Sequence, residues 1–119
     1  MTAAEEAETI EIDLIEIDET IDIEERARRH RHAYSVTVKT PAGFAARFRV
    51  HPREHVETLT RHAIRHFTAR GELGEGDYDL EKVDGASTVP LTSSATLEDS
   101  GVGPDAVCVL VVAGPQVDG

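Results

Sequence analysis

The strongest constraint in this sequence is a two-residue alternation of apolar and polar side chains that runs through two neighbouring segments. It spans residues 34–39 and is repeated over residues 46–50. This period is typical of strands that have one apolar face and one polar face. The residues between them, 40–43, include a proline, whose φ is preset, and a glycine, which tolerates positive φ. The pattern therefore predicts a β-hairpin over residues 34–50, with one apolar face to bury.

An amphipathic helix is expected directly after the hairpin. Apolar residues recur at intervals of three and four from Val56 to Phe67, which places them on one side of a helix. Pro52 suits the first turn of a helix, and Gly71 is a typical C-terminal stop. These signals predict a helix over residues 52–70 whose apolar stripe packs against the hairpin.

The second half of the chain predicts further strands. Residues 78–83 read as a strand, residues 86–95 as a loop with at most a two-residue strand, and residues 96–102 as one capped helical turn. The continuously apolar run 107–112 is typical of a central strand. We therefore expect an α+β fold in which a mixed four- to five-stranded sheet packs on one helix. The last strand should lie beside the first, in the middle of the sheet.

The charge of the chain divides it into a tail and a domain. The net charge is −11, and the first 25 residues contain 11 acids and neither lysine nor arginine. We expect residues 1–33 to be an acidic, disordered tail that ends in a short basic hinge, residues 34–113 to be the folded domain, and residues 114–119 to be a flexible C-terminal tail. An acidic tail disfavours nucleic acid and membranes as partners and favours a basic protein surface.

A second interpretation of the N-terminal segment remains open. Its aliphatic residues alternate with acids, and such a pattern also suits a strand added to the edge of a sheet. The segment could then dock on its own domain, on a second copy or on a partner. The aliphatic residues of this possible strand-addition motif are Ile10, Ile12, Leu14, Ile15 and Ile17.

The sequence contains no signal for catalysis or for a metal ion. It lacks paired catalytic carboxylates, a glycine-rich phosphate loop and a nucleophile elbow. His55, His62 and His66 lie near one another on the expected helix, but no carboxylate or cysteine completes a metal site. Cys108 lies within an apolar strand and reads as a buried thiol. We therefore expect a protein that is not an enzyme and has no cofactor.

The same composition bounds the compartment. No apolar run approaches the roughly 20 residues that span a bilayer, and the acidic N-terminus differs from a signal peptide. A single cysteine allows no internal disulfide, which suits a reducing compartment. The expected localisation is cytoplasmic.

The order of elements and several short motifs resemble ubiquitin, whose fold is the β-grasp. The hairpin and the later turn reproduce ubiquitin residues at the same spacing, and the resemblance covers about 80 residues of the chain. The matching residues are Val38, Lys39, Thr40, Gly43, Val50 and Pro52 in the hairpin, and Thr96, Leu97 and Asp99 further on. The resemblance implies a ubiquitin-like β-grasp domain.

The sequence is more similar still to compact bacterial ubiquitin-like proteins. The shared features are a tyrosine in the third strand, an x-Leu-x-Asp-x-Gly-x segment and an Ala-Gly step after the last strand. Here they appear as Tyr78-Asp79-Leu80, as residues 96–102 and as Ala113-Gly114 followed by Gly119. Such proteins are encoded with an activating enzyme, a conjugating enzyme and a JAB-type metallopeptidase. The resemblance implies that these three enzymes are the partners.

The resemblance also implies where a modifier would act. Its acyl donor would be Gly119, while Gln116 and Val117 stand where ubiquitin has its Gly-Gly. Lys39 and Lys82 are the lysines on which chains could grow. The outward residues of the last strand would form a docking patch for partners, with Cys108 and Leu110 pointing inward. These patch residues are Val107, Val109 and Val111.

Two other classes of protein use the same fold. The runner-up is a non-covalent binding module, such as a ubiquitin-like component of a type VII secretion system. A sulfur carrier is the third class, but it needs a terminal Gly-Gly that this sequence lacks.

Overall fold

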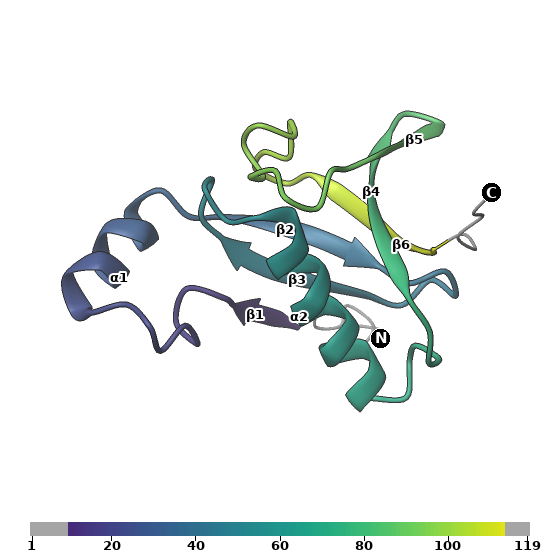
Figure 1. Ribbon diagram of the computed structural model, residues 1–119, viewed down its shortest axis with the longest axis horizontal. Helices are drawn as coiled ribbons and strands as arrows, with labels where there is room; N and C mark the ends of the chain where they lie inside the picture. Colours follow the sequence, from purple (N-terminus) through teal and green to yellow (C-terminus); the bar gives the residue numbers. More distant parts are fainter. Residues whose placement is uncertain (1–9, 114–119) are drawn as a thin grey trace, which may run out of the picture.

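The computed structural model describes residues 10–113, which form one six-stranded mixed sheet and two helices. The strands are β1 (Glu11–Asp13), β2 (Tyr34–Lys39), β3 (Ala45–Val50), β4 (Tyr78–Asp84), β5 (Ser87–Pro90) and β6 (Val107–Val112), and the helices are α1 (Ile23–Arg31) and α2 (Val56–Ala69). The strand order across the sheet is β1-β3-β2-β6-β4-β5. Figure 1 shows α2 lying across one face of this sheet. The expected α+β architecture is confirmed, with six strands in place of four or five. In the described part, neither helix is long and apolar enough to cross a membrane.

The predicted hairpin is present, and its buried face is the one that the sequence predicts. Strands β2 and β3 pair antiparallel, with Tyr34 opposite Val50. The turn is closed by hydrogen bonds from the Thr40 N–H to the Phe44 carbonyl (2.8 Å) and from the Gly43 N–H to the Thr40 carbonyl (2.9 Å). The φ of Gly43 is +101°, which explains why glycine suits this position.

The hydrophobic core lies between the sheet and α2. Strand β6 pairs in parallel with β2, Val38 being opposite Cys108, and antiparallel with β4, Leu80 being opposite Leu110. The expectation that the last strand lies beside the first is therefore confirmed. From α2 the buried core residues are Val56, Leu59, Ala63 and Phe67.

The start of α2 differs from the prediction. The helix begins at Val56, not at Pro52, and its N-cap is His55, whose side chain makes no capping hydrogen bond. Residues before the helix are held by the segment that follows β5: the Glu98 N–H donates to the Pro52 carbonyl (2.9 Å). The Val56 N–H donates to the Ala95 carbonyl (2.9 Å). Tertiary backbone hydrogen bonds thus satisfy the first free donors of α2, a role that side-chain caps usually fill.

The end of α2 follows the prediction. Gly71 has a φ of +73°, and its N–H donates to the Thr68 carbonyl (3.0 Å). The Glu72 N–H donates to the Phe67 carbonyl (2.8 Å). This pair of bonds is a Schellman motif, which requires a left-handed residue such as glycine just past the helix.

The N-terminal segment corrects the expectation of a disordered tail over residues 1–33. Residues 10–33 form β1 and α1, while residues 1–9 lie outside the described part of the chain. Alternating aliphatic and acidic residues cannot build a core alone, but they complete one that already exists. Leu14 is 3% exposed within the core cluster, and Ile12 packs against that cluster.

The expected basic hinge is the second half of α1. Asp22 caps this helix, since its Oδ1 accepts a hydrogen bond from the Glu25 N–H (2.8 Å). Acids occupy the first turn and basic residues the last turn, which complements the helix dipole. The Arg29 Nε is 2.7 Å from the Glu25 Oε2, one turn earlier. In Figure 1, α1 lies beyond one end of the sheet and away from α2.

Strand β5 is longer than expected. It runs from Ser87 to Pro90 and pairs antiparallel with β4, where the sequence indicated at most two strand residues. Gly85, with a φ of +63°, allows the tight turn between the two strands. All four residues of β5 are exposed, so this strand shows no apolar face that periodicity can detect.

The turn at residues 96–102 behaves as predicted. The Thr96 Oγ1 accepts a hydrogen bond from the Asp99 N–H (3.1 Å), which is the expected cap. Leu97 and Val102 both point inward and are fully buried. The Tyr34 hydroxyl donates to the Val102 carbonyl (2.6 Å) and ties this turn to β2.

Candidate functional site

The chain leaves the sheet at the end of β6. Val112 is the last strand residue, and the Ala113 N–H donates to the Asp77 carbonyl (2.9 Å). The predicted acyl donor, Gly119, belongs to residues 114–119, which lie outside the described residues. The structure thus shows where residues 114–119 are attached to the sheet, at the end of β6.

The three valines assigned to a docking patch share one face of β6. Exposure alternates along the strand: Cys108 and Leu110 are fully buried, whereas Val107, Val109 and Val111 are half-buried. The structure therefore places the valines on the face opposite α2, as their period-two spacing predicts.

Charged residues flank this row on both sides. Val109 lies opposite Lys39 of β2 and opposite Glu81 of β4. Lys39 is exposed and Glu81 is half-buried. A partner that docks on this face would meet an apolar strip between a basic and an acidic side chain.

The two lysines differ in accessibility. Lys39 ends β2 and is exposed. Lys82 is half-buried on β4 opposite Cys108, and its Nζ lies 3.7 Å from where a Cβ on Gly101 would stand. Lys39 is therefore more accessible to solvent than Lys82.

The strand-addition motif is divided between the sheet edge and a turn. Ile12 belongs to β1, and Leu14 and Ile15 are buried directly after it. Ile10 and Ile17 are 39% and 49% exposed. The motif thus docks on its own domain in this structure, through β1 and the two residues that follow.

A groove between α2 and β4 is a feature that sequence reasoning missed. It has a volume of about 630 Å³, and its apolar lining includes Ile64, Leu80 and Leu91. Arg61 and Arg65 of α2 line it as well. Ile64 is the residue after Ala63 of the buried stripe of α2. Its position in the sequence therefore predicts only that it lies at the side of that stripe, and it does not predict a groove.

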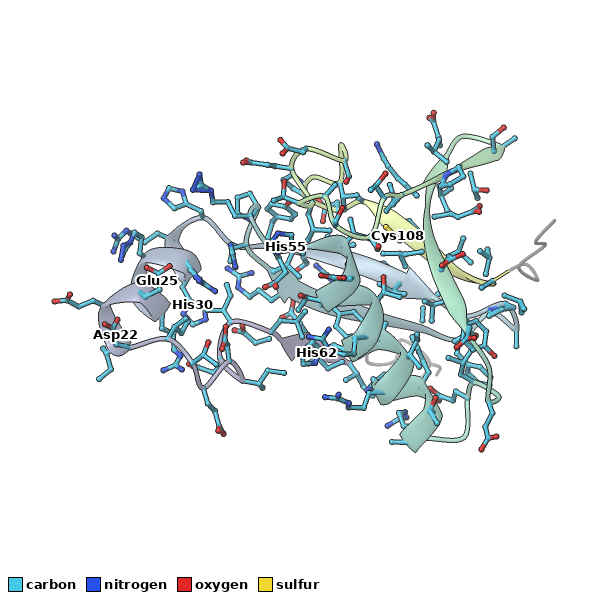
Figure 2. The ribbon with its side chains drawn as sticks, viewed as in Figure 1. Asp22, Glu25, His30, His55, His62 and Cys108 are labelled. Atoms are coloured by element: carbon cyan, nitrogen blue, oxygen red, sulfur yellow. The ribbon has the colours of Figure 1, made fainter. Side chains whose placement is uncertain are left out.

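The helix histidines do not converge on a metal site. Figure 2 shows His55 just before α2 and His62 within the helix. Among residues 10–113, no group of three or more histidine, cysteine, aspartate or glutamate side chains is placed to hold a metal ion. Burial, followed by the charges of Arg61 and Arg65, lowers the pKa of His62. Burial also lowers the pKa of His66.

These two histidines should make the fold less stable in mild acid. Because their pKa values are lower in the folded chain than in the unfolded chain, their stabilising effect is present above about pH 6.5 and is lost as the pH falls. We expect the melting temperature to fall between pH 7.5 and pH 5.5, and to fall less in the double variant His62→Gln/His66→Gln. Replacing the exposed His55 with glutamine is the matched control for the substitution itself. An equal drop in all three proteins would contradict the assignment.

Comparisons with known proteins agree on the fold. No family model and no curated protein matches the sequence. A de novo design based on ubiquitin is similar over 73% of this chain and 98% of its own, with 15% identity and a TM-score of 0.52. A chain of the toluene 4-monooxygenase HD complex with the inhibitor 4-bromobenzoate is similar over 68% of this chain and 99% of its own, with 17% identity and a TM-score of 0.56. A chain of the ESX-5 inner membrane complex is similar over 74% of this chain and 23% of its own, with 18% identity and a TM-score of 0.52. The chain therefore has a ubiquitin-like β-grasp fold.

Proposed function

We propose that the chain is a ubiquitin-like protein modifier of the bacterial type, activated at Gly119 and transferred to lysines of target proteins. The observation that carries the proposal is the placement of β6. This strand lies in the middle of a ubiquitin-like sheet and runs directly into residues 114–119. The partners would be an activating enzyme, a conjugating enzyme and a JAB-type peptidase that reverses the modification.

Activation of such a modifier requires an accessible carboxylate. The Gly119 carboxylate attacks the α-phosphate of ATP, which forms an acyl adenylate and releases pyrophosphate. A cysteine thiolate of the activating enzyme then displaces AMP to form a thioester, and a target lysine amine displaces the thiol to form an isopeptide bond. Glycine suits this position because it has no side chain to hinder approach to the carbonyl carbon.

The test is thioester formation with the cognate activating enzyme and ATP. We expect the full chain to form a thioester that thiol reductant removes, and the chain lacking Gly119 to form none. Ile23→Ala, which changes an exposed side chain of α1 at the opposite end of the sheet from the end of β6, is the control and should be charged like the wild type. Equal charging of the deletion variant would exclude Gly119 as the acyl donor.

The same assay separates the two acceptor lysines. With the conjugating enzyme added, Lys39→Arg should reduce linkage of one copy to another far more than Lys82→Arg, because Lys39 is exposed and Lys82 is half-buried. The charge is the same in both variants, so they form a matched pair. A greater loss with Lys82→Arg would contradict this order.

The alternative is a non-covalent binding module, for example in a type VII secretion system. It is favoured by the half-buried valine row and by the ESX-5 chain, which carries this fold within a larger assembly. Under this alternative, Gly119 is dispensable, and the valine face of β6 binds the partner. Val109→Asp should then abolish partner binding, while deletion of Gly119 should have no effect on it.

A further inference from the structure

Strand β1 occupies the edge of β3 in the way that a bound peptide would. The pairing is parallel and covers three residues, Ile12 being opposite Phe48. Two backbone hydrogen bonds frame it: the Arg47 N–H donates to the Ile10 carbonyl (2.9 Å) and the Leu14 N–H donates to the Arg49 carbonyl (3.0 Å). Figure 1 shows β1 as the outermost strand on this side of the sheet. We refer to the surface of β3 and α2 covered by residues 10–14 as the β1 seat.

The side chains of the seated segment divide by chemistry. Ile12 and Leu14 face the core, and Leu14 is buried. Glu11 faces the other side, where its Oε2 accepts a hydrogen bond from the Ser35 hydroxyl (2.7 Å). On β3, Arg47 and Arg49 lie opposite the two acids of β1. The β1 seat therefore selects an extended segment in which aliphatic and acidic residues alternate.

The remainder of the arm holds β1 only through polar contacts and one buried side chain, Ile15. Helix α1 has no buried residue. Arg26 of this helix contacts the Ile15 carbonyl (3.5 Å), the Asp18 carbonyl (2.6 Å) and the Glu16 carboxylate (4.0 Å). Arg29 contacts the Asp18 carboxylate (3.5 Å), and His30 contacts the Asp13 carboxylate of β1 (3.1 Å). Partly exposed ion pairs of this kind contribute little each. Detachment of the arm would expose Leu14 and Ile15 but would leave the core residues of the other strands and of α2 packed on one another.

The chain also carries the docking tetrapeptide twice. Ile-Glu-Ile-Asp occurs at residues 10–13 and again at residues 15–18. The first occurrence supplies β1, whereas the second forms a turn, with Ile17 49% exposed. A motif that fits the seat is therefore present in a form that is not paired as a strand.

We propose that the β1 seat is a docking site for extended partner peptides that alternate aliphatic and acidic residues, and that β1 occupies this site in cis until such a peptide displaces it. The site does not involve Gly119, so its test is independent of the test of the proposed modifier function. Main-chain pairing with β3 supplies most of the affinity, and the two inward aliphatic positions supply the specificity. The arm lowers the apparent affinity in proportion to the fraction of time that the seat is free.

The test is binding of a fluorescent peptide with the sequence of residues 10–18 to the full chain, measured by anisotropy. Leu14→Asp removes the buried anchor of β1 and should raise the affinity for the peptide at least tenfold, which corresponds to a seat filled in cis about 90% of the time or more. Ile17→Asp places the same new charge on the same arm at an exposed position and is the matched control, with wild-type affinity expected. A peptide of the same composition with its four acids grouped together should not bind.

A second variant guards against loss of fold. Arg26→Ala removes the contacts of the Arg26 guanidinium with the Ile15 and Asp18 carbonyls without touching the core, and it should raise the affinity by a smaller factor. Amide shifts on peptide binding should centre on Arg47 and Arg49. Equal affinity of wild type and Leu14→Asp, or shifts centred on β5, would overturn the proposal. So would a wild-type dimer formed by exchange of β1, because a second copy would then be the occupant.

Discussion

Replacing Phe67 with alanine is expected to lower the free energy of unfolding by about 3–5 kcal/mol. Phe67 comes from the last turn of α2, is fully buried and belongs to the core cluster between helix and sheet. Truncation removes its apolar surface from the core and leaves a cavity that the surrounding residues fill only in part. Alanine is itself the best helix former, so the loss reports packing and not helix propensity. Urea denaturation followed by far-ultraviolet circular dichroism measures it.

Phe44→Ala is the matched control. This phenylalanine lies in the turn between β2 and β3 and is 46% exposed. The same chemical change there should alter stability by less than about 0.5 kcal/mol, as surface substitutions usually do. Equal losses for the two variants would show that α2 is not packed on the sheet as described. A domain of this size has only about 5–15 kcal/mol of stability in total, so Phe67→Ala should leave it near its limit.

The parts of the fold that the sequence predicts are those in which local periodicity and tertiary packing agree. The hairpin is predictable because β2 and β3 each bury one face, so every second residue is apolar. The end of α2 is equally predictable, because Gly71 has a φ of +73°, a value that residues with a side chain rarely adopt. The burial alternation of β6, with Val109 outward and Leu110 inward, follows from the same period of two.

The errors arise where distant segments decide the local structure. Pro52 has the signature of a helix start, but residues 52–55 form a turn and a β-bridge that are hydrogen-bonded to residues 95–98, and this delays the helix to Val56. The N-terminal arm looks too polar to fold because its apolar residues Ile12 and Leu14 pack on a core that is formed by later residues. One local signal was available there: the capping pair of Asp22 and Glu25 marks the start of α1.

The structure also changes the meaning of the acidic N-terminus. Several of its acids are not free to meet a basic partner, because the arm neutralises them itself. Asp18 lies 3.5 Å from Arg29, and hydrogen bonds from Thr20 are the main reason that the pKa of Asp18 is lowered. The hydrogen bond from Arg29 likewise lowers the pKa of Glu25. The acids and bases of residues 10–33 thus interact with one another within a folded arm.

The thiol of Cys108 is expected to react with a disulfide reagent at least 100-fold more slowly in the folded chain than in the unfolded chain. It is fully buried in β6, and desolvation raises its pKa to about 11, although the charge of Lys82 acts in the opposite direction. With that pKa, about 0.1% of the thiol is ionised at pH 8, against roughly a quarter for an ordinary cysteine with a pKa of about 8.5. Only the thiolate attacks a disulfide, so the smaller ionised fraction slows the reaction, and burial of the sulfur in the core slows it further.

Ellman's reagent at pH 8, with and without denaturing urea, measures this ratio. Because the Cys108 side chain points into the core between the sheet and α2, the folded chain can expose the thiol only by opening that core. A ratio below ten would mean that the core around β6 opens readily. The base of residues 114–119 and the Val109 face would then be mobile, and neither a modifier nor a docking module of this fold would present a fixed surface to its partners. A ratio above 100 that falls when Phe67→Ala weakens the core would show that the reaction proceeds through opening of the fold, and that the core holds this central strand in place.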